Sequence, residues 1–427
     1  MSISGKFANG YKTAAVIVLN TLLLLIVINL VLFVIFRTVD EAKITPDTQF
    51  AYSKSGHFYE NGTAVDNGKR TPSNLNVFDY TAFEDSMSEP EISQMLDEFY
   101  DHSRMGFAYQ PWSQYGPRLF SGKYLNVALE PNGLAVRRTI NSPATGKDQK
   151  IVKIFAFGGS TTFGSGVPDA HTWPSYLSQI LNDRARNENL DIRVEVTNYG
   201  RVGFYPTQEL HLLLDILRTG QRPELIIFLE GVNIGRDDDT PNLTPSYHRI
   251  INEAQLGSDR QWQSLPMVRL AGAIAARSEP KATPDADRPD TRVQTEQLVE
   301  RFQQFRSSVL AISDLYGTQP VFFLQPDGHY NYPDHLYGSG KSPSSPRARA
   351  QKKEFYAGFP KDSGFVDLTG LFAEWGDRKA IMDAAHYTPN FSKFVAQKIA
   401  DRINLAELKP VKQEKVIATG IPRKQYP

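Results

Sequence analysis

Residues 151–166 read IVKIFAFGGSTTFGSG, and this stretch has the strongest structural signal in the chain. It begins as a short apolar strand and then reaches two glycines, Gly158 and Gly159, followed by Ser160. A serine just after a buried strand, on a turn that only small residues allow, is where α/β folds display a nucleophile. We therefore take Ser160 as the candidate nucleophile.

Apolar strands alternate with amphipathic helices from this stretch onward. The predicted strands cover residues 152–157, 192–197, 225–229, 321–324 and 365–368. The predicted helices begin near Thr172 and Thr207, run through Leu298 to Ile312, and begin again at Thr388. Continuous apolar strands separated by helices indicate a parallel sheet covered on both faces, so the predicted fold class is α/β.

The composition is that of a globular protein, and its charge balance implies no acidic partner. Hydrophobic residues make up 41% of the 427 residues, and Lys plus Arg and Asp plus Glu each number 47. With a net charge of zero, nucleic acid is not an expected partner. The chain has no cysteine, which excludes disulfides, thiolate metal sites and a cysteine nucleophile.

Residues 14–36 form an uncharged apolar run that is interrupted only by Asn20, Thr21 and Asn29. At about 1.5 Å per residue the run spans about 35 Å, enough for the ~30 Å hydrocarbon core of a bilayer. The alternative is a cleaved signal peptide, but its apolar core typically has ~7 to 15 residues and ends in a small-residue cleavage site. Residues 37–40 supply no such site, so we predict a transmembrane anchor.

The orientation of this anchor follows from weaker signals. Basic residues lie on both sides of the run, so charge counting alone does not decide between the two orientations. The short basic tail favours residues 1–13 in the cytoplasm. The expected location is then a single-pass membrane protein whose large domain lies in the periplasm or outside the cell.

The rest of the chain divides into regions by composition. Residues 40–142 are polar and aromatic, and we expect an ordered lead-in region. The main domain is predicted over 151–405, with a tail over 406–427. Within it, 277–295 has almost no apolar residue and is expected to be a surface insertion. Residues 327–353 follow the fourth strand and are expected to be either a substrate lid or a plain exposed loop.

The groups needed for acyl chemistry follow the predicted strands, at the edge where parallel strand ends converge. Ser160 can attack a carbonyl carbon, His386 can take and return the proton, and Asp383 can hold the imidazole in the right tautomer. The backbone N–H groups of Ser160 and Gly203 and the side chain of Asn233 would bind the oxyanion. The structural alternatives are a helix cap for Ser160 and a turn residue for Asn233.

Four blocks, FGGSTTFG, NYGRVG, EGVN and DAAH, occur in this order along the chain. With them the chain resembles the SGNH (GDSL-type) hydrolase superfamily, and its aromatic lead-in is similar to that of membrane-anchored bacterial members. The resemblance covers residues 152–403. It implies a three-layer α/β/α, flavodoxin-like fold and ester hydrolysis without a metal. The signature positions that it implies are Ser160, Gly203, Asn233 and His386, with Asp383 as the acid.

Two positions depart from the family pattern. The family commonly has Asp before the serine, where this chain has Gly159, and Asp after the asparagine, where this chain has Ile234. Neither position holds a catalytic group, so the predicted triad is unaffected.

Phosphate, dinucleotide and metal sites fit the sequence poorly. The glycine-rich stretch from Gly159 to Gly164 lacks the following lysine of a P-loop, and the dinucleotide fingerprint cannot be laid over it. The histidines and aspartates within 327–335 do not have the spacing of a zinc motif. No cofactor and no metal are predicted.

The function predicted from these observations is that of a membrane-anchored serine esterase. Its substrate would be an acyl ester, with acetyl groups on carbohydrate as one candidate. One alternative is an acyltransferase that passes the acyl group from the same serine to a sugar. The other is a catalytically idle binding or assembly protein that keeps the fold.

Overall fold

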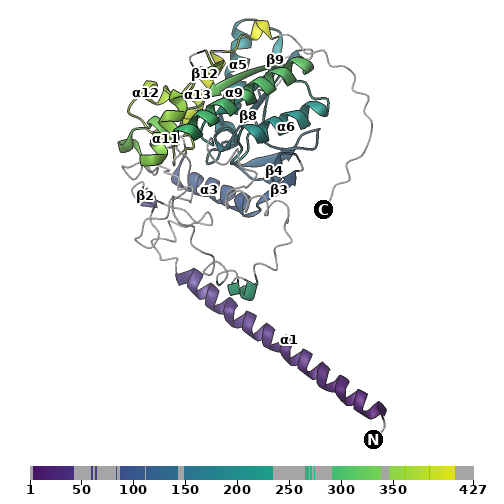
Figure 1. Ribbon diagram of the computed structural model, residues 1–427. Coiled ribbons are helices and arrows are strands. Elements are labelled where there is room, and N and C mark those ends of the chain that lie inside the picture. The colour runs from purple at the N-terminus through teal and green to yellow at the C-terminus, as the bar shows by residue number, and fades with distance from the viewer. Residues whose placement is uncertain are drawn as a thin grey trace.

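The computed structural model describes most of the chain (Figure 1). The described residues are 3–42, 87–142, 149–233, 291–337 and 346–408 apart from positions 111, 361 and 384, with short pieces at 59–60, 63–64, 83, 265–268, 270–271 and 274.

The centre of the main body is an eight-stranded sheet with the strand order β12-β11-β10-β8-β9-β7-β6-β5. Five neighbouring strands are parallel: β8 (Lys150–Gly158), β9 (Ile192–Asn198), β10 (Leu225–Glu230), β11 (Gln319–Leu324) and β12 (Phe365–Asp367). In chain order these strands lie as 2-1-3-4-5, which is the flavodoxin-like arrangement. The five predicted strands and their parallel pairing are confirmed.

The sheet is mixed, and the prediction of a purely parallel sheet is wrong at one edge. The lead-in region contributes β5 (Phe120–Ser121), β6 (Asn126–Leu129) and β7 (Ala135–Arg137), which run antiparallel. β7 joins β9 through the pair Arg137 and Asn198. Strands of 2 to 4 residues are too short to show a periodic pattern, which is why the sequence did not reveal them.

The lead-in region also places a helix and a hairpin on the body. The helix is α3 (Glu89–Arg104), and the hairpin pairs β3 (Phe107–Gln110) with β4 (Gln114–Pro117). The described part of the lead-in is therefore an ordered part of the same body, with residues buried under the sheet edge such as Tyr115 and Leu125.

Helices cover both faces of the sheet, so the predicted three layers are present (Figure 1). Strand β8 shows why: Ile154 and Ala156 face one apolar cluster, and the alternate residues Phe155 and Phe157 face the other. The first cluster includes α5 (Trp173–Asn187), α12 (Leu371–Trp375) and α13 (Pro389–Ala400). The second includes α6 (Pro206–Arg218), α9 (Thr291–Tyr316) and α11 (Pro346–Ala357).

Two of the predicted helix starts are visible in the capping contacts. The Thr172 hydroxyl accepts the N–H of Ser175 at 3.3 Å at the start of α5. The Thr388 hydroxyl accepts the N–H of Phe391 at 3.2 Å at the start of α13. In both helices a proline occupies the first turn, where its missing N–H has no helical partner to lose.

Helix α1 (Ile3–Ala42) stands apart from the body (Figure 1). Its stretch Tyr11–Ile35 is 25 residues long and none of it is buried. By length and composition this N-terminal helix could be a membrane span or a signal sequence.

The expected insertion, loop and tail are described only in part. Of the insertion, 277–290 lie outside the described residues, and Thr291 begins α9. The region 327–353 contains α10 (Gly328–Asn331), the 3₁₀ turn η4 (Asp334–Leu336) and the first part of α11, with 338–345 outside the described residues. Tyr332 and Tyr337 are buried in the first apolar cluster, and a lid role for this region stays a prediction. Of the tail, only the end of the 3₁₀ turn η5 (Leu405–Glu407) and Leu408 are described.

Candidate active site

Ser160 begins the short helix α4 (Ser160–Phe163) one residue after the end of β8, the strand that lies between β9 and β10 in the parallel part of the sheet. The turn depends on Gly158, whose φ is +150°. A Cβ on Gly158 would lie 2.1 Å from Thr162 Oγ1 and 2.9 Å from the Leu229 carbonyl oxygen, so no other residue fits there. This close approach places Ser160 at the carboxyl edge of the sheet.

Asp383 and His386 form a hydrogen-bonded pair in the loop before α13. Asp383 Oδ2 lies 2.6 Å from His386 Nδ1. The other oxygen, Oδ1, accepts the backbone N–H groups of Ala385 at 2.8 Å and His386 at 2.7 Å. A bridge between Ile381 and Tyr387 closes the turn around the pair. The short D-x-x-H spacing is therefore that of a tight turn in which the carboxylate orients the ring.

The electrostatics of this pair favour an ionised Asp383. Burial acts to raise the pKa of the Asp383 carboxyl, but the opposite charge of His386 and the N–H donors around the carboxylate outweigh it, so the pKa is lowered. A carboxylate at Nδ1 holds the proton on that nitrogen, so Nε2 of a neutral ring has the lone pair that a general base needs.

Asn233 follows β10 and lies against the nucleophile turn. Its Nδ2 donates to the Phe204 carbonyl oxygen at 2.7 Å. A Cβ on Gly159 would lie 2.1 Å from the same nitrogen. A side chain at position 159 would therefore displace the asparagine amide.

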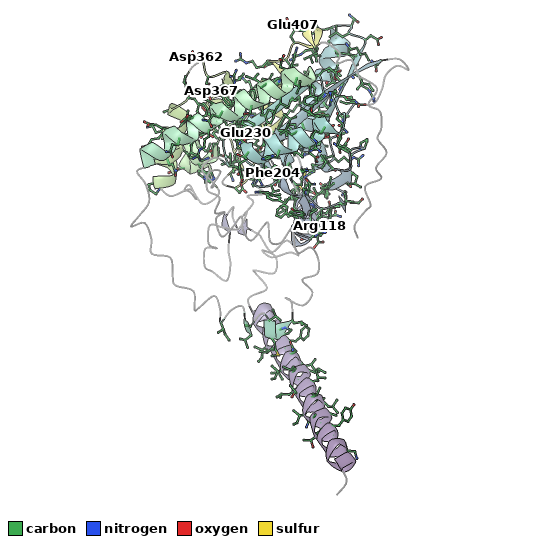
Figure 2. All side chains as sticks on the ribbon, turned by 45° about the vertical axis from the view of Figure 1, so that its right-hand side comes forward. Arg118, Phe204, Glu230, Asp362, Asp367 and Glu407 are labelled. Atoms are coloured by element: carbon green, nitrogen blue, oxygen red, sulfur yellow. The ribbon has the colours of Figure 1, made fainter. Side chains whose placement is uncertain are left out.

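Gly203 lies in the loop between β9 and α6, next to Phe204, whose carbonyl oxygen holds Asn233. Its φ of +77° is in the left-handed region that favours glycine. Figure 2 shows Phe204 and Glu230, which precedes the Asn233 loop, on neighbouring parts of the body. The three loops that carry the predicted oxyanion donors thus meet around Gly159 and Asn233.

Gln325, which the sequence analysis missed, connects the same loops. It follows β11, and one end of its amide lies 2.7 Å from Thr161 Oγ1 and 3.2 Å from the Tyr387 hydroxyl. The Tyr387 proton goes to the Pro326 carbonyl oxygen at 2.7 Å, so the Gln325 nitrogen must be the group that faces the tyrosine. Its oxygen then accepts the N–H groups of Val232 at 2.9 Å and Gly231 at 3.3 Å.

Through these contacts Gln325 links the neighbours in sequence of three predicted site residues. Thr161 follows Ser160, Tyr387 follows His386, and Val232 precedes Asn233. One buried side chain therefore fixes the relative positions of the three loops. A signal for Gln325 was present, because it stands directly after a predicted strand, at the edge where the other candidates were sought.

A buried ion pair supports the Asn233 loop from behind. Lys352 of α11 lies 3.1 Å from Asp327 Oδ2 and donates to the carbonyl oxygens of Gly231 at 2.7 Å and Val232 at 2.8 Å. The Tyr356 hydroxyl donates to the same carboxylate oxygen at 3.1 Å. Burial acts to raise the pKa of Asp327, but Lys352 and His329 outweigh it, and the pKa is lowered.

Two buried arginines join the lead-in region to the catalytic loops. Arg137 of β7 lies 2.6 Å from Asp169 Oδ1 and donates to the Val167 carbonyl oxygen at 2.8 Å, in the loop after Ser160. Arg201 lies in the Gly203 loop and donates to the Tyr115 carbonyl oxygen at 2.7 Å. The Tyr115 hydroxyl in turn donates to the Val202 carbonyl oxygen at 3.0 Å.

A pair of buried carboxyl groups, Glu209 of α6 and Glu230 of β10, lies beside the same loops. Burial raises the pKa of Glu209 to about 7, and the neighbouring Glu230 acts in the opposite direction. The N–H of Glu209 donates to the Tyr205 carbonyl oxygen at 3.2 Å, which ties this pair to the end of the Gly203 loop.

No metal site is formed among the described residues, where no group of three or more His, Asp or Glu side chains is arranged around a common point. The aspartate at 327, which lies in the His- and Asp-containing stretch noted in the sequence, is occupied by Lys352 and Tyr356.

Comparisons with known proteins return matches only among solved structures. No family model matches the chain, and no curated protein matches it. The neighbours are hydrolases and esterases of the SGNH or GDSL type. They include the acetyl xylan esterase AlAXEase, with 12% identity and a TM-score of 0.32 over 59% of this chain and 100% of that one. A proposed lipolytic protein of the G-D-S-L family from Desulfitobacterium hafniense DCB-2 has 14% identity and a TM-score of 0.31 over 58% and 98%.

A third neighbour is the psychrotrophic esterase EstA from Pseudoalteromonas sp., with 12% identity and a TM-score of 0.29 over 58% of this chain and 94% of that one. With TM-scores of 0.29 to 0.32 and identities of 12 to 14%, these three neighbours do not establish a function for this chain. The functional assignment therefore rests on the geometry of the site.

Proposed function

We propose that the protein is a serine esterase in which Ser160 is the nucleophile, His386 the general base and Asp383 the residue that orients it. The observation that carries the proposal is the Asp383–His386 pair, 2.6 Å apart and reinforced by two backbone N–H donors. It occurs in the same body in which Ser160 begins a helix at a glycine turn and Asn233 packs against residue 159.

The proposed reaction has two halves. In the first, Ser160 Oγ attacks the ester carbon while His386 Nε2 takes its proton, and the alcohol leaves with that proton as an acyl-serine forms. In the second, a water molecule attacks the acyl carbon while His386 Nε2 takes its proton. Ser160 Oγ then leaves with that proton, and the free acid is released. The N–H groups of Ser160 and Gly203 and the Asn233 amide stabilise the oxyanion in both halves, each donor contributing about 3 kcal/mol.

The first test is the variant Ser160→Ala. Hydrolysis of a small acyl ester is expected to fall by about 10⁴-fold or more, because the attacking oxygen is removed. The matched control is Ser165→Ala, a buried serine in the same loop that has no proposed role and is expected to keep turnover near wild type. Wild-type turnover in a folded Ser160→Ala protein would refute the proposal.

A serine-reactive fluorophosphonate distinguishes the esterase from an idle binding protein. The probe is expected to label the wild-type protein at Ser160 and to leave Ser160→Ala and His386→Ala unlabelled, since labelling requires an activated hydroxyl. An unlabelled wild-type protein would favour the binding or assembly role.

Acyl transfer to a sugar hydroxyl is the second candidate. The observation that favours it is the low exposure of the reacting groups, with Ser160 8% and His386 5% exposed, because transfer must compete with attack by water. Product analysis in the presence of an added sugar acceptor separates the two activities. A hydrolase yields free acid alone, whereas a transferase yields the acylated sugar.

We propose further that α1 anchors the protein in a membrane, with residues 1–13 in the cytoplasm and the body in the periplasm or outside the cell. The support is the unburied apolar stretch Tyr11–Ile35. Acetyl esters of carbohydrates are the first substrates to test. Protease added to spheroplasts, in which the cytoplasmic membrane is intact and the outer membrane is opened, is expected to digest the body and leave the N-terminal tail protected.

A further inference from the structure

Three polar residues interrupt the apolar stretch of α1, and one of them has a distant partner. Thr21 Oγ1 donates to the Ile17 carbonyl oxygen at 2.8 Å within the helix. Asn29 Nδ2 likewise donates to the Leu25 carbonyl oxygen at 2.9 Å. The remaining amide oxygen of Asn29 accepts the backbone N–H of Met267 at 3.2 Å, 238 positions further along the chain.

Met267 belongs to a short helical piece that we call the 265–274 segment. Its described residues are Leu265, Pro266, Met267, Val268, Leu270, Ala271 and Ile274, all of them apolar. The side chains of Leu265, Leu270 and Ile274 are 48%, 40% and 57% exposed. Figure 1 shows this piece beside the end of α1 that is nearer the body. Such a set of exposed apolar side chains is unfavourable in water and favourable against lipid.

A groove of about 410 Å³ lies between the two elements, lined by α1 residues from Leu22 to Phe33 and by Leu265 and Pro266. Its depth in a membrane follows from the helix geometry. Asn29 lies six residues before Ile35, the end of the apolar stretch, which corresponds to about 9 Å. Interfacial helices bury their apolar face by about 5–10 Å, so the segment lies at the depth expected for the headgroup and acyl boundary.

We propose that the 265–274 segment is a second membrane contact, which lies in the bilayer interface alongside α1 and is held there by Asn29. The proposal rests on the proposed membrane anchoring by α1. It explains why a polar side chain is placed in the apolar stretch, because the Met267 N–H and the Asn29 oxygen satisfy each other where water is scarce.

This contact also sets how the catalytic edge is presented. The segment lies in the connection between β10 and α9, and Asn233 is the third residue of that connection. In Figure 2, Phe204 and Glu230 lie nearer α1 than Asp362 and Glu407 do. A body tethered both by α1 and by the 265–274 segment therefore turns the carboxyl edge of its sheet towards the bilayer surface.

The experiment uses the absence of cysteine from the chain, which allows single labelling sites without background. An environment-sensitive fluorophore is attached to Leu270→Cys, Ile274→Cys, Leu24→Cys in α1, or Leu315→Cys. Leu315 is an exposed leucine of α9 in the body and serves as the matched control in water. The full-length protein is placed in vesicles of phosphatidylethanolamine and phosphatidylglycerol, with lipid nitroxides located either near the headgroup or deep in the acyl chains.

The expected result is loss of fluorescence at 270 and 274 with the shallow nitroxide, loss at 24 with the deep one, and no loss at 315. Leu24 is the deep reference because it lies eleven residues, or about 16 Å, before Ile35. Quenching at 24 without quenching at 270 and 274 would overturn the second contact and leave the anchor intact. The absence of quenching at all four sites would overturn the anchor itself and the second contact with it.

The role of Asn29 is tested in the same assay. Adding Asn29→Leu to Leu270→Cys is expected to reduce quenching at 270, while the same change added to Leu24→Cys leaves quenching at 24 unaltered. Undiminished quenching at 270 would overturn Asn29 as the group that holds the segment.

Discussion

Arg137 and Arg201 are both buried between the lead-in region and a catalytic loop, but their partners differ. Arg137, which holds the loop after Ser160, has the carboxylate of Asp169 at 2.6 Å. Arg201, which holds the Gly203 loop, has neutral acceptors within hydrogen-bonding distance among the described residues. They are the Tyr115 carbonyl oxygen at 2.7 Å, Ser113 Oγ at 3.3 Å and the side chain of Gln110.

Because their partners differ, the two arginines are expected to affect different properties of the protein. Burial lowers the pKa of Arg201 to about 10, so its guanidinium is still charged at neutral pH. Breaking a buried ion pair from one side leaves an uncompensated charge, whereas neutral acceptors that lose a donor lose only hydrogen bonds. We expect the first arginine to matter most for the stability of the body and the second for the placement of an oxyanion donor.

The largest effect is expected for Asp169→Ala. It leaves the Arg137 charge buried and unpaired and removes the acceptor of Asn126 Nδ2, which lies 2.8 Å from Asp169 Oδ2. The free energy of unfolding should fall by about 3–5 kcal/mol, measured by urea denaturation in detergent. The control is the double variant Arg137→Met with Asp169→Leu, which removes both charges and should lose less. A single variant as stable as wild type would contradict the proposed role of the pair.

A smaller loss is expected for Lys352→Met. Asp327 is then left without its cation, but Lys352 is 14% exposed, so the loss should be about 2–3 kcal/mol, below that of a fully buried pair. The Gly231 and Val232 carbonyl oxygens also lose their donor, and kcat should fall by up to about 100-fold as Asn233 shifts. Lys353→Met, one residue away on the same helix, is the control. Unchanged kcat would show that Lys352 does not position the Asn233 loop.

For Arg201→Met we expect the stability loss to be smaller again, about 1–3 kcal/mol. The activity should respond differently from the stability, because the Gly203 N–H binds the oxyanion and not the ground-state ester. A lower kcat with an unchanged KM is therefore expected from steady-state kinetics. Equal losses of stability and of kcat in Asp169→Ala and Arg201→Met would remove the distinction between the two arginines.

The smallest effect concerns the pH dependence at Glu209. Its folded-state pKa of about 7 lies above the ordinary glutamate value of 4.5, so its contribution to stability is present below about pH 4.5 and is lost as the pH rises to about 7. Glu230 faces it across the pair. In Glu209→Gln the unfolding midpoint should decline less between these pH values than in wild type. Parallel pH profiles would contradict this.

The sequence revealed the long, periodic elements and the polar residues after strands. The five parallel strands, the helix starts at Thr172 and Thr388, and the Asp383–His386 pair all followed from local patterns. Gln325, Lys352 and Arg137 did not, because nothing local marks a buried polar side chain and their partners are distant in the sequence. Lys352 and Asp327 are 25 positions apart, and Gln325 and Thr161 are 164 positions apart. The roles of Ser160, Gly203 and Asn233 in catalysis stay predictions.

The pairing of β7 with β9 has a consequence for how the protein can be divided. Without β5, β6 and β7, strand β9 would end the sheet with its N–H and C=O groups exposed, and exposed edges pair with other chains. A fragment that begins at residue 150, where the parallel strands start, is therefore expected to aggregate. The smallest piece suitable for expression begins before α3, at about residue 83, where Phe83 is already buried.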